Sequence, residues 1–368
     1  MAMRYIASIS SAILVLVCAV AQTARAADLL DAGSGAVTTF ATGLDNPRGL
    51  KFGPDGYLYV AEGGSGGSNP VPAGCQGVEP PIGPYTGSET GSRISRIAAD
   101  GTRTTVVDGL PSSQTAPAPA PLVSGVADVA FIGDTLYAVL GGAGCSHGVA
   151  MPNAVIRIET DGTWTPVADL SAYARNNPVA NPPEHDFEPD GTWYSMIAVR
   201  GNLYTLEPNR GELVKVTPSG RVSRIADFSA SQGHVVPSAL AFHGTFYVGN
   251  LDVFPIQEGA SKIYKVTPSG VIKSVVEGLT TVLGLTFDER GRMYALENTT
   301  GAGNLFPTPG TGRIVRISPS GDVDVIATGL FLPTAITFGP DGNLYVSNVG
   351  FGPPPVGLGE VLKIEIVD

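Results

Sequence analysis

One carboxylate, Asp128, stands where a repeated sequence pattern otherwise places small or apolar residues. Six short apolar segments can be aligned on an anchor such as Phe52 or Phe131, and Asp128 then lies three residues before its anchor. The other residues at that position are Gly49, Met196, Ala239, Gly284 and Ala335. A carboxylate in such surroundings needs a hydrogen-bonding partner, a metal ion or a raised pKa. Asp128 is therefore a candidate for ligand or metal binding, and hydrogen bonding to the backbone is the alternative.

Polar residues recur where a second set of apolar segments ends. They are Glu62, Glu207, Asn250, Glu297, Asn298 and Asn348. Carboxylate and amide oxygens that converge on one point are what Ca²⁺ accepts, about six to eight at a time. If a metal ion binds, we expect its ligands among Asp128, Glu207 and Glu297. The alternative is that these polar ends form a solvated rim or cap turns, and the chain then needs no cofactor.

The segment 181–191, NPPEHDFEPDG, gathers ionisable side chains: Glu184, His185, Asp186, Glu188 and Asp190. A histidine beside carboxylates can bind a metal ion or act as a general base, so His185, Asp186 and Glu188 are candidate ligand-binding residues. Their spacing matches no zinc signature. A charged surface loop is the alternative.

No local catalytic motif accompanies these candidates. The sequence has no G-x-S-x-G elbow, no P-loop and no H-E-x-x-H motif, and His147, His234 and His243 are isolated in it. Missing motifs exclude only those enzymes that carry a local signature.

Cys75 and Cys145 are the cysteines that follow the N-terminal apolar segment, and they are candidates for a disulfide. Their pairing would close a loop of about 70 residues and stabilise the fold by about 4 kcal/mol in the chain-entropy model. Two unpaired loop thiols are the alternative.

The candidate residues belong to one unit that is repeated six times. TGLDNPRGLKFGPDGYLYVAEGG from Thr42 and TGLFLPTAITFGPDGNLYVSNVG from Thr328 are its clearest copies. One tyrosine marks each copy: Tyr59, Tyr137, Tyr204, Tyr247, Tyr294 and Tyr345. Each unit contains four short β-branched runs separated by glycine and proline turns, which indicates four antiparallel strands. The sequence therefore predicts an all-β, six-bladed β-propeller, and its 48 glycines and 30 prolines exclude a helical protein.

The two ends of the chain predict how the ring closes. GAVTTFATGL from Gly35 matches GDVDVIATGL from Gly321, which is the fourth strand of its unit. The chain ends on VLKIEIVD, a third strand without a fourth. The N-terminal strand should therefore complete the C-terminal blade.

Connection lengths separate the two faces of the predicted ring. The turns between first and second strands and between third and fourth strands are tight, whereas the other connections include long ones such as 62–91, 171–193 and 250–261. By strand parity the long connections share one face. Because function is commonly carried by loops on a rigid scaffold, we expect a small molecule or a partner protein to bind there.

Residues 1–26 have the features of an export signal. Arg4 precedes an apolar run, and Ala24, Arg25 and Ala26 form the small-x-small pattern of a cleavage site. We expect cleavage near Ala26, a secreted or periplasmic protein, and a single propeller domain over 27–368. No later apolar stretch is long enough for membrane insertion. The net charge of −11 argues against nucleic acid as a partner, and we expect a monomer.

Several segments resemble the ScyD/ScyE family of exported, NHL/TolB-like six-bladed propellers, named for the biosynthetic cluster of the pigment scytonemin. The segments are TGLDNPRGLKFGPDGYLYVAEGG, DGTWTPVADLSAYARNNP, FYVGNLDVFPIQEGASKIYKV and PTAITFGPDGNLYVSNVG. The resemblance implies export and a role in extracytoplasmic secondary-metabolite biosynthesis. It assigns no catalytic residue. Members typically carry NPDGGEVDSNPYG where this chain has NNPVANPPEHDFEPDGTWYS, so this loop is altered in detail.

A broader resemblance is to SMP-30-like lactonases, which are also six-bladed. That family takes its metal ligands from Glu, Asn and Asp at the starts of inner strands. This chain has Pro47, Val126, Tyr194, Pro237, Val282 and Pro333 at those positions, and none of them is a metal ligand. The leading hypothesis is therefore a small-molecule-binding, partner-binding or accessory propeller. A metal-dependent hydrolase, lactonase or lyase, with Ca²⁺ as the cation to test, is the alternative.

Overall fold

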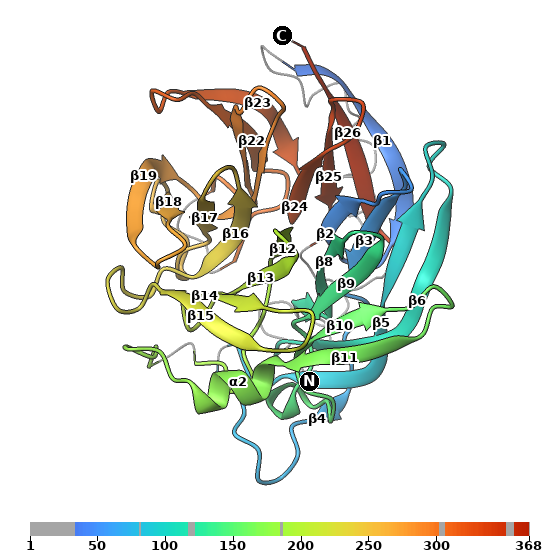
Figure 1. The fold of residues 1–368 in the computed structure, drawn as a ribbon, viewed down its shortest axis with the longest axis vertical. Helices are drawn as coiled ribbons and strands as arrows, with labels where there is room; N and C mark the ends of the chain where they lie inside the picture. The colour runs from blue at the N-terminus through green and yellow to red at the C-terminus, as the bar shows by residue number, and fades with distance from the viewer. Residues whose placement is uncertain are drawn as a thin grey trace, which may run out of the picture.

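Six antiparallel sheets surround a central axis (Figure 1). The structure is a computed structural model that describes residues 34–80, 82–116, 122–184, 187–301, 306–350 and 357–367. Of the described residues, 51% lie in strands and 3% in helices, so the predicted all-β, six-bladed propeller is confirmed. The export signal over 1–26 lies outside the described residues and stays a prediction. Among the described residues, no helix has the length and apolar character needed to cross a membrane.

Each blade has four main strands, counted outward from the axis, and in blade 1 the short strands β4 (Asn69–Pro70) and β7 (Val123–Ser124) pair with the third and fourth strands. The inner strands are β2 (Pro47–Phe52), β8 (Val126–Ile132), β12 (Met196–Val199), β16 (Pro237–Phe242), β20 (Val282–Phe287) and β24 (Ala335–Phe338). The second strands are β3 (Leu58–Glu62), β9 (Thr135–Leu140), β13 (Asn202–Glu207), β17 (Phe246–Asn250), β21 (Met293–Glu297) and β25 (Leu344–Asn348). The third strands are β5 (Thr86–Ile97), β10 (Ala154–Ile158), β14 (Glu212–Val216), β18 (Ser261–Val266), β22 (Gly312–Ile317) and β26 (Gly359–Ile366). The outer strands are β6 (Arg103–Gln114), β11 (Trp164–Asp169), β15 (Val222–Asp227), β19 (Ile272–Leu279), β23 (Val323–Leu330) and β1 (Ser34–Leu44).

The N-terminal strand closes the ring, as the sequence predicted. β1 pairs antiparallel with β26, and Val37 lies opposite Ile364 (Figure 1). The sixth blade therefore combines strands from both ends of the chain. This pairing ties the two ends of the chain into one sheet and so closes the ring.

Apolar side chains between adjacent blades form the core. Every residue of β3, LYVAE, is buried. Tyr59 and Ala61 pack with residues of blade 2, and Leu58 and Val60 pack with residues of blade 6. Tyr59 of blade 1 packs edge-on against Phe131 of blade 2, with ring centroids 5.0 Å apart. The inner strands are thus held in fixed positions around the axis.

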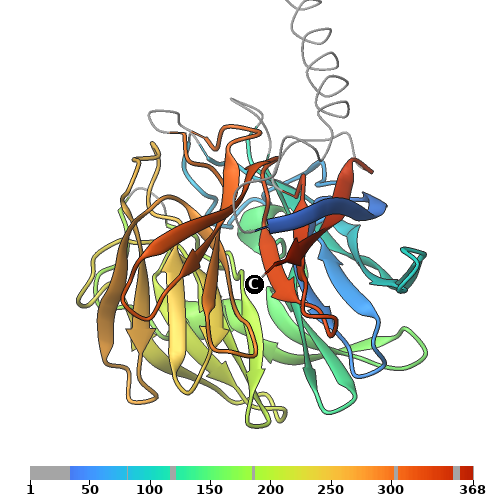
Figure 2. The ribbon, with the colours of Figure 1, turned by 90° about the horizontal axis from the view of Figure 1, so that it is seen from above.

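The two faces of the ring differ in their connections (Figure 2). Tight turns on one face follow the sequence pattern. In Pro218–Gly220, for example, Gly220 adopts φ +86° and donates its N–H to the Thr217 carbonyl at 2.9 Å. The opposite, long-loop face carries the strands β4 (Asn69–Pro70) and β7 (Val123–Ser124), the 3-10 helix η2 (Cys145–His147) and the helix α2 (Leu170–Asn176). Asp169 caps the N-terminus of helix α2, and its carboxylate accepts the Ala172 N–H at 2.7 Å.

Candidate functional site

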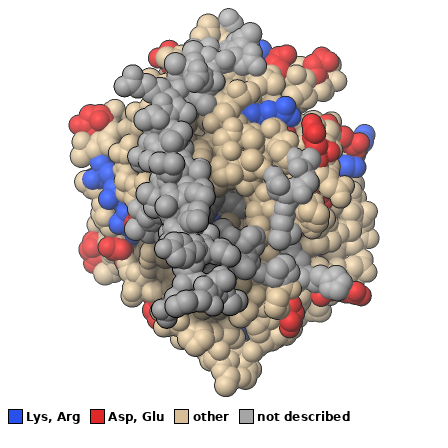
Figure 3. All heavy atoms as spheres, turned by 180° about the vertical axis from the view of Figure 1, so that it is seen from behind, with Lys and Arg blue, Asp and Glu red and all other residues tan. Residues whose placement is uncertain are grey.

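A mainly apolar cavity of about 140 Å³ lies on the long-loop face, and we call it the long-loop pocket. The starts of four inner strands contribute to it through Arg48, Ala127, Ser238 and Leu283, so it lies at the axis. Loops supply most of the remaining wall, including Leu122, Trp193, Val236, Leu251 and Phe254. Figure 3, seen from the side opposite to Figure 1, shows few charged side chains, most of them near the margin.

Arg48 brings a buried cation to this pocket. Its side chain is 4% exposed, donates to the Val123 carbonyl, and lies 5.8 Å from the centroid of the Tyr194 ring. Burial raises the pKa of Tyr194, so its phenol stays protonated at neutral pH and can donate to the Thr334 carbonyl at 3.3 Å. A guanidinium in apolar surroundings favours a ligand with an anionic group or a strong acceptor.

Glu188 brings a buried carboxylate to the same pocket. It is 1% exposed, and its Oε1 accepts the Tyr85 hydroxyl at 3.1 Å. Its Oε2 lies 3.1 Å from Nε2 of His147, whose Nδ1 lies 2.9 Å from the Ser113 hydroxyl. The Tyr85 ring stacks on the His147 ring at 4.3 Å. Of this four-residue network, Glu188 and Tyr85 line the long-loop pocket.

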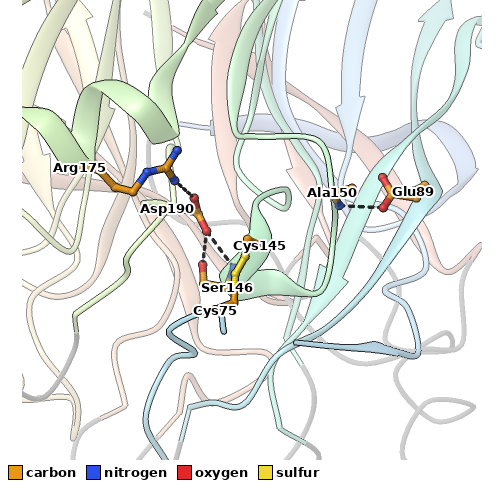
Figure 4. The surroundings of a disulfide bond; sticks show 7 residues. All are labelled: Cys75, Glu89, Cys145, Ser146, Ala150, Arg175 and Asp190. Atoms are coloured by element: carbon orange, nitrogen blue, oxygen red, sulfur yellow. Dashed lines mark hydrogen bonds and ion pairs between the residues drawn. A yellow bond between two sulfur atoms is a disulfide. The ribbon is translucent and has the colours of Figure 1, made fainter. Parts of the chain in front are cut away.

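A disulfide anchors the network (Figure 4). Cys75, in the long connection of blade 1, is bonded to Cys145, the first residue of η2. The next residue, Ser146, donates its N–H and its hydroxyl to Oδ2 of Asp190, both at 2.8 Å. Arg175 of α2 forms an ion pair with the other oxygen of Asp190. The loop that carries Glu188 is therefore fixed to blades 1 and 2.

These contacts correct the surface-loop interpretation of segment 181–191. Glu188 and Asp190 are 1% and 3% exposed, so the interpretation is wrong for both, whereas Glu184 is exposed. His185 and Asp186 lie outside the described residues. His147 is not isolated either. Its partners lie 34 and 41 residues away in sequence, and this separation hid them.

The polar ends of the second strands have a recurring local contact. In four blades the side-chain oxygen accepts a backbone N–H from the connection that precedes the inner strand of the same blade. The pairs are Glu62 with Asp45 (2.6 Å), Glu207 with Thr192 (2.8 Å), Glu297 with Thr280 (2.6 Å) and Asn348 with Phe331 (2.9 Å). The structure thus places these residues as buried caps of turns.

The remaining contacts of this set are also internal. Arg93 and Arg103 lie on Glu62, and Arg313 lies on Glu297. Burial raises the pKa of Glu207 to about 8, against the opposing effect of its N–H donors. Asn250 accepts the Lys262 N–H at 2.6 Å, and Asn298 donates to the Pro333 carbonyl at 2.7 Å. None of the six polar strand-end residues is among the described residues that line the long-loop pocket. The six are Glu62, Glu207, Asn250, Glu297, Asn298 and Asn348.

Asp128 lies elsewhere, in a second cavity that we call the axial cavity. This cavity has a volume of about 490 Å³, and it is lined by inner strands on the short-turn side of the axis. The Asp128 carboxylate accepts the N–H groups of Val129 at 2.8 Å and Met196 at 2.7 Å. Burial raises its pKa to about 7. Gly49 and Asp128 lie together, as their aligned positions predicted, since the Asp128 carboxyl lies over Gly49. Met196, Gly284 and Ala335 line the same cavity, whereas Ala239 is not among its lining residues.

The donor set does not fit a Ca²⁺ ion. In the described part of the chain, no group of three or more His, Cys, Asp or Glu side chains could hold a metal ion. Asp128 lies in the axial cavity, whereas Glu207 and Glu297 cap their own blades. The positions that start the inner strands carry no carboxylate or amide that could replace them.

Sequence reasoning missed Arg48, although the repeat contains a signal for it. The residue after the start of each inner segment is Arg48, Ala127, Ser195, Ser238, Leu283 or Thr334. Arg48 is the only charged residue among these six aligned positions. They directly precede the six aligned positions at which Asp128 was the only carboxylate.

Comparisons with known proteins support the fold. No protein-family model matches the chain, and a search of curated proteins finds no match. Similar solved structures include a gluconolactonase from Xanthomonas campestris, at 13% identity and TM-score 0.53, covering 94% of this chain and 93% of that one. A putative glucose dehydrogenase from Thermus thermophilus has 17% identity and TM-score 0.55, covering 90% and 100%. The PQQ-bound aldose sugar dehydrogenase of Streptomyces coelicolor has 16% identity and TM-score 0.54, covering 92% and 100%. At these identities the likeness shows the six-bladed propeller fold.

Proposed function

We propose that this chain takes a small, mainly apolar organic molecule into the long-loop pocket and acts on it as a lactonase or lyase that needs no metal ion at the axis. The observation that carries the proposal is a cation and a carboxylate, Arg48 and Glu188, both buried in the wall of one apolar cavity. Small-molecule sites typically combine an apolar lining with a few placed polar groups.

The size of the pocket limits the ligand. A dry cavity of about 150 Å³ holds a molecule the size of benzene. The long-loop pocket, at about 140 Å³, therefore accepts a single ring, with any larger part extending toward the long loops. Arg48 would receive a carbonyl or carboxylate oxygen of that molecule.

The reaction class is chosen because gluconolactonase is among the proteins that share this fold. Lactone hydrolysis needs a group that polarises the carbonyl and a base that activates water. Arg48 is suited to the first role and Glu188 to the second. His147 and Tyr85 would hold the carboxylate of Glu188 in place. The proposal includes export and an extracytoplasmic role like that implied by the ScyD/ScyE resemblance.

A pair of valine variants tests where the ligand binds. Val253 lines the long-loop pocket and is 38% exposed, whereas Val271 is 61% exposed beside a turn on the opposite face. Binding of benzoate and benzyl alcohol can be measured by ligand-observed NMR. We expect Val253→Trp to weaken both about tenfold or more by filling the pocket mouth, and Val271→Trp to leave both unchanged. Equal affinities for the two variants would contradict the proposed site.

A second experiment tests the reaction. EDTA-treated protein is assayed against a panel of small lactones, and we expect hydrolysis that Glu188→Gln reduces by about 100-fold or more. Glu184→Gln, an exposed change nearby, is the control. Binding without turnover would instead assign the chain to the binding-protein hypothesis.

A further inference from the structure

The axial cavity contains few charged groups. Among its lining residues, Lys51, Asp128 and Arg200 are the ionisable ones. The wall consists of the inner strands, which are the terminal strands of their sheets. One edge of each inner strand therefore lacks a neighbouring strand and can offer backbone N–H and C=O groups to the cavity.

Lys51 and Asp128 approach each other from adjacent blades. Gly49 and Lys51 lie on the same side of β2, because they are two residues apart in the strand. The Asp128 side chain lies over Gly49, where a Cβ atom would come within 1.8 Å of the Asp128 Oδ1. The absence of a side chain at Gly49 thus gives the Asp128 carboxyl its place. Lys51 is the next residue on that side of the strand, toward the short turns.

Lys51 has no bonded counter-charge. In the described part of the chain, its amine forms no hydrogen bond and no ion pair within 4.0 Å. The Lys51 side chain is exposed to the cavity. The inner strands around it lower the pKa of its amine, and the nearby Asp128 opposes that shift. The Asp128 oxygens already accept two backbone N–H groups, and Ser195 adds its hydroxyl at 3.4 Å. Since burial raises the pKa of Asp128 to about 7, it is only partly ionised near neutral pH.

We propose that the axial cavity binds a small oxyanion, a short carboxylate or inorganic phosphate, at the Lys51 amine. An ammonium group that faces a cavity can donate charge-assisted hydrogen bonds to an anion that enters it. The cavity, at about 490 Å³, has room for such an ion with part of its hydration shell. Arg200 adds positive charge at the end of β12 nearest the short turns.

The state of Asp128 gives this site a pH dependence. The ionisable groups that face it are Lys51 and Arg200 in the axial cavity and Tyr194 on the long-loop side. Below about pH 7 Asp128 is neutral and does not repel an incoming anion, whereas above that pH its carboxylate competes for Lys51. Binding should therefore be several-fold tighter at about pH 6 than at about pH 8. Acetate is the suitable probe, because its charge is the same at both values.

The test is an acetate titration of the full ¹⁵N-labelled chain, followed through the amide resonances of residues 49–51, 128–129 and 196. We expect saturable shifts there, and Lys51→Met should weaken binding about tenfold or more through loss of a charge-assisted hydrogen bond. Lys273→Met, an exposed lysine on β19, is the control and should change nothing. A parallel titration with inorganic phosphate compares the two kinds of oxyanion.

Three results would overturn the proposal: wild-type protein without saturable shifts at these amides, equal binding by Lys51→Met and wild type, or equal binding at both pH values. Asp128→Asn should bind acetate equally at both pH values. If that variant does not fold, the comparison of Lys51→Met with Lys273→Met still decides whether the anion binds at Lys51. Because the long-loop pocket is probed with other residues and other ligands, failure here leaves the proposed function untouched.

Discussion

Two cavities lie along the axis of this propeller, and their walls are built differently. The long-loop pocket is enclosed mainly by loops, and its buried acid Glu188 belongs to a network that a disulfide ties to two other blades. The axial cavity is enclosed by inner strands, and its cation Lys51 forms no bond to a described side chain. Loops need cross-links to hold charges in place, whereas strands already fixed by the ring can leave a charge available to a ligand.

Of the changes considered, removal of the disulfide should differ most in its effects on the two cavities. Its sequence separation of 70 residues corresponds to a loss of about 4 kcal/mol for Cys75→Ser with Cys145→Ser. Urea unfolding with and without reductant measures that loss. Benzoate binding in the long-loop pocket should weaken about tenfold or more because Glu188 loses its support. Acetate shifts in the axial cavity should stay the same, and equal loss at both sites would refute the difference between them.

The turn-capping carboxylates support the loops in another way. Glu62→Ala should destabilise the fold by about 3 kcal/mol, because it leaves Arg93 and the Asp45 N–H without their buried acceptor. Glu159→Ala removes one member of an exposed ion pair with Arg157 and should cost about 0.5 kcal/mol or less. Denaturant unfolding of both variants checks this. Similar small losses would mean that Glu62 is not a structural cap.

The pH dependence of stability reports on the axial cavity. The folded chain keeps a proton on Asp128 up to about pH 7, whereas the unfolded chain loses it near the ordinary aspartate pKa of 3.8. Stability should therefore fall as pH rises between these values, by about 2 kcal/mol from about pH 5 upward, with Glu207 extending the fall to about pH 8. Asp128→Asn should flatten the lower part of this curve in pH-resolved unfolding. If the stability curve of Asp128→Asn ran parallel to that of the wild type, Asp128 would be ionised at all these pH values.

The smallest expected effect is that of Lys51→Met on stability. Because Lys51 forms no bond to a described residue, its replacement should change the free energy of unfolding by about 0.5 kcal/mol or less. Thermal unfolding of the variant measures this. A large loss would reveal a structural role for the amine and weaken the contrast with Glu188.

The fold could be predicted because its determinants are local and repeated. The Pro-Asp-Gly and Pro-Ser-Gly turns, the β-branched runs and the matching chain ends each predict one strand or one pairing, and β1 with β26 confirms the last. The inner-strand register was also accessible, since a period of two places Gly49 and Asp128 on defined sides.

The candidate site could be predicted only in part. Glu188 was singled out by the charges around it, but its burial depends on Tyr85 and His147, which are 103 and 41 residues away in sequence. The polar ends of the second strands looked like a ligand set, because sequence does not tell whether an oxygen faces a funnel or a backbone N–H. Arg48 could have been found from its charge at an aligned position that is otherwise uncharged, but that position was not compared across the repeats.

The most direct test of the long-loop pocket uses Trp193. The chain has two tryptophans, and Trp193, 1% exposed, lines the pocket, whereas Trp164 lies on the outer strand β11. In Trp164→Phe protein, emission comes from Trp193 alone. We predict a saturable change in that emission on titration with benzoate. When Val253→Trp is added, ligand-observed NMR should show benzoate binding weakened about tenfold or more. Benzoate binding that leaves Trp193 emission unchanged would place the ligand elsewhere and contradict the account.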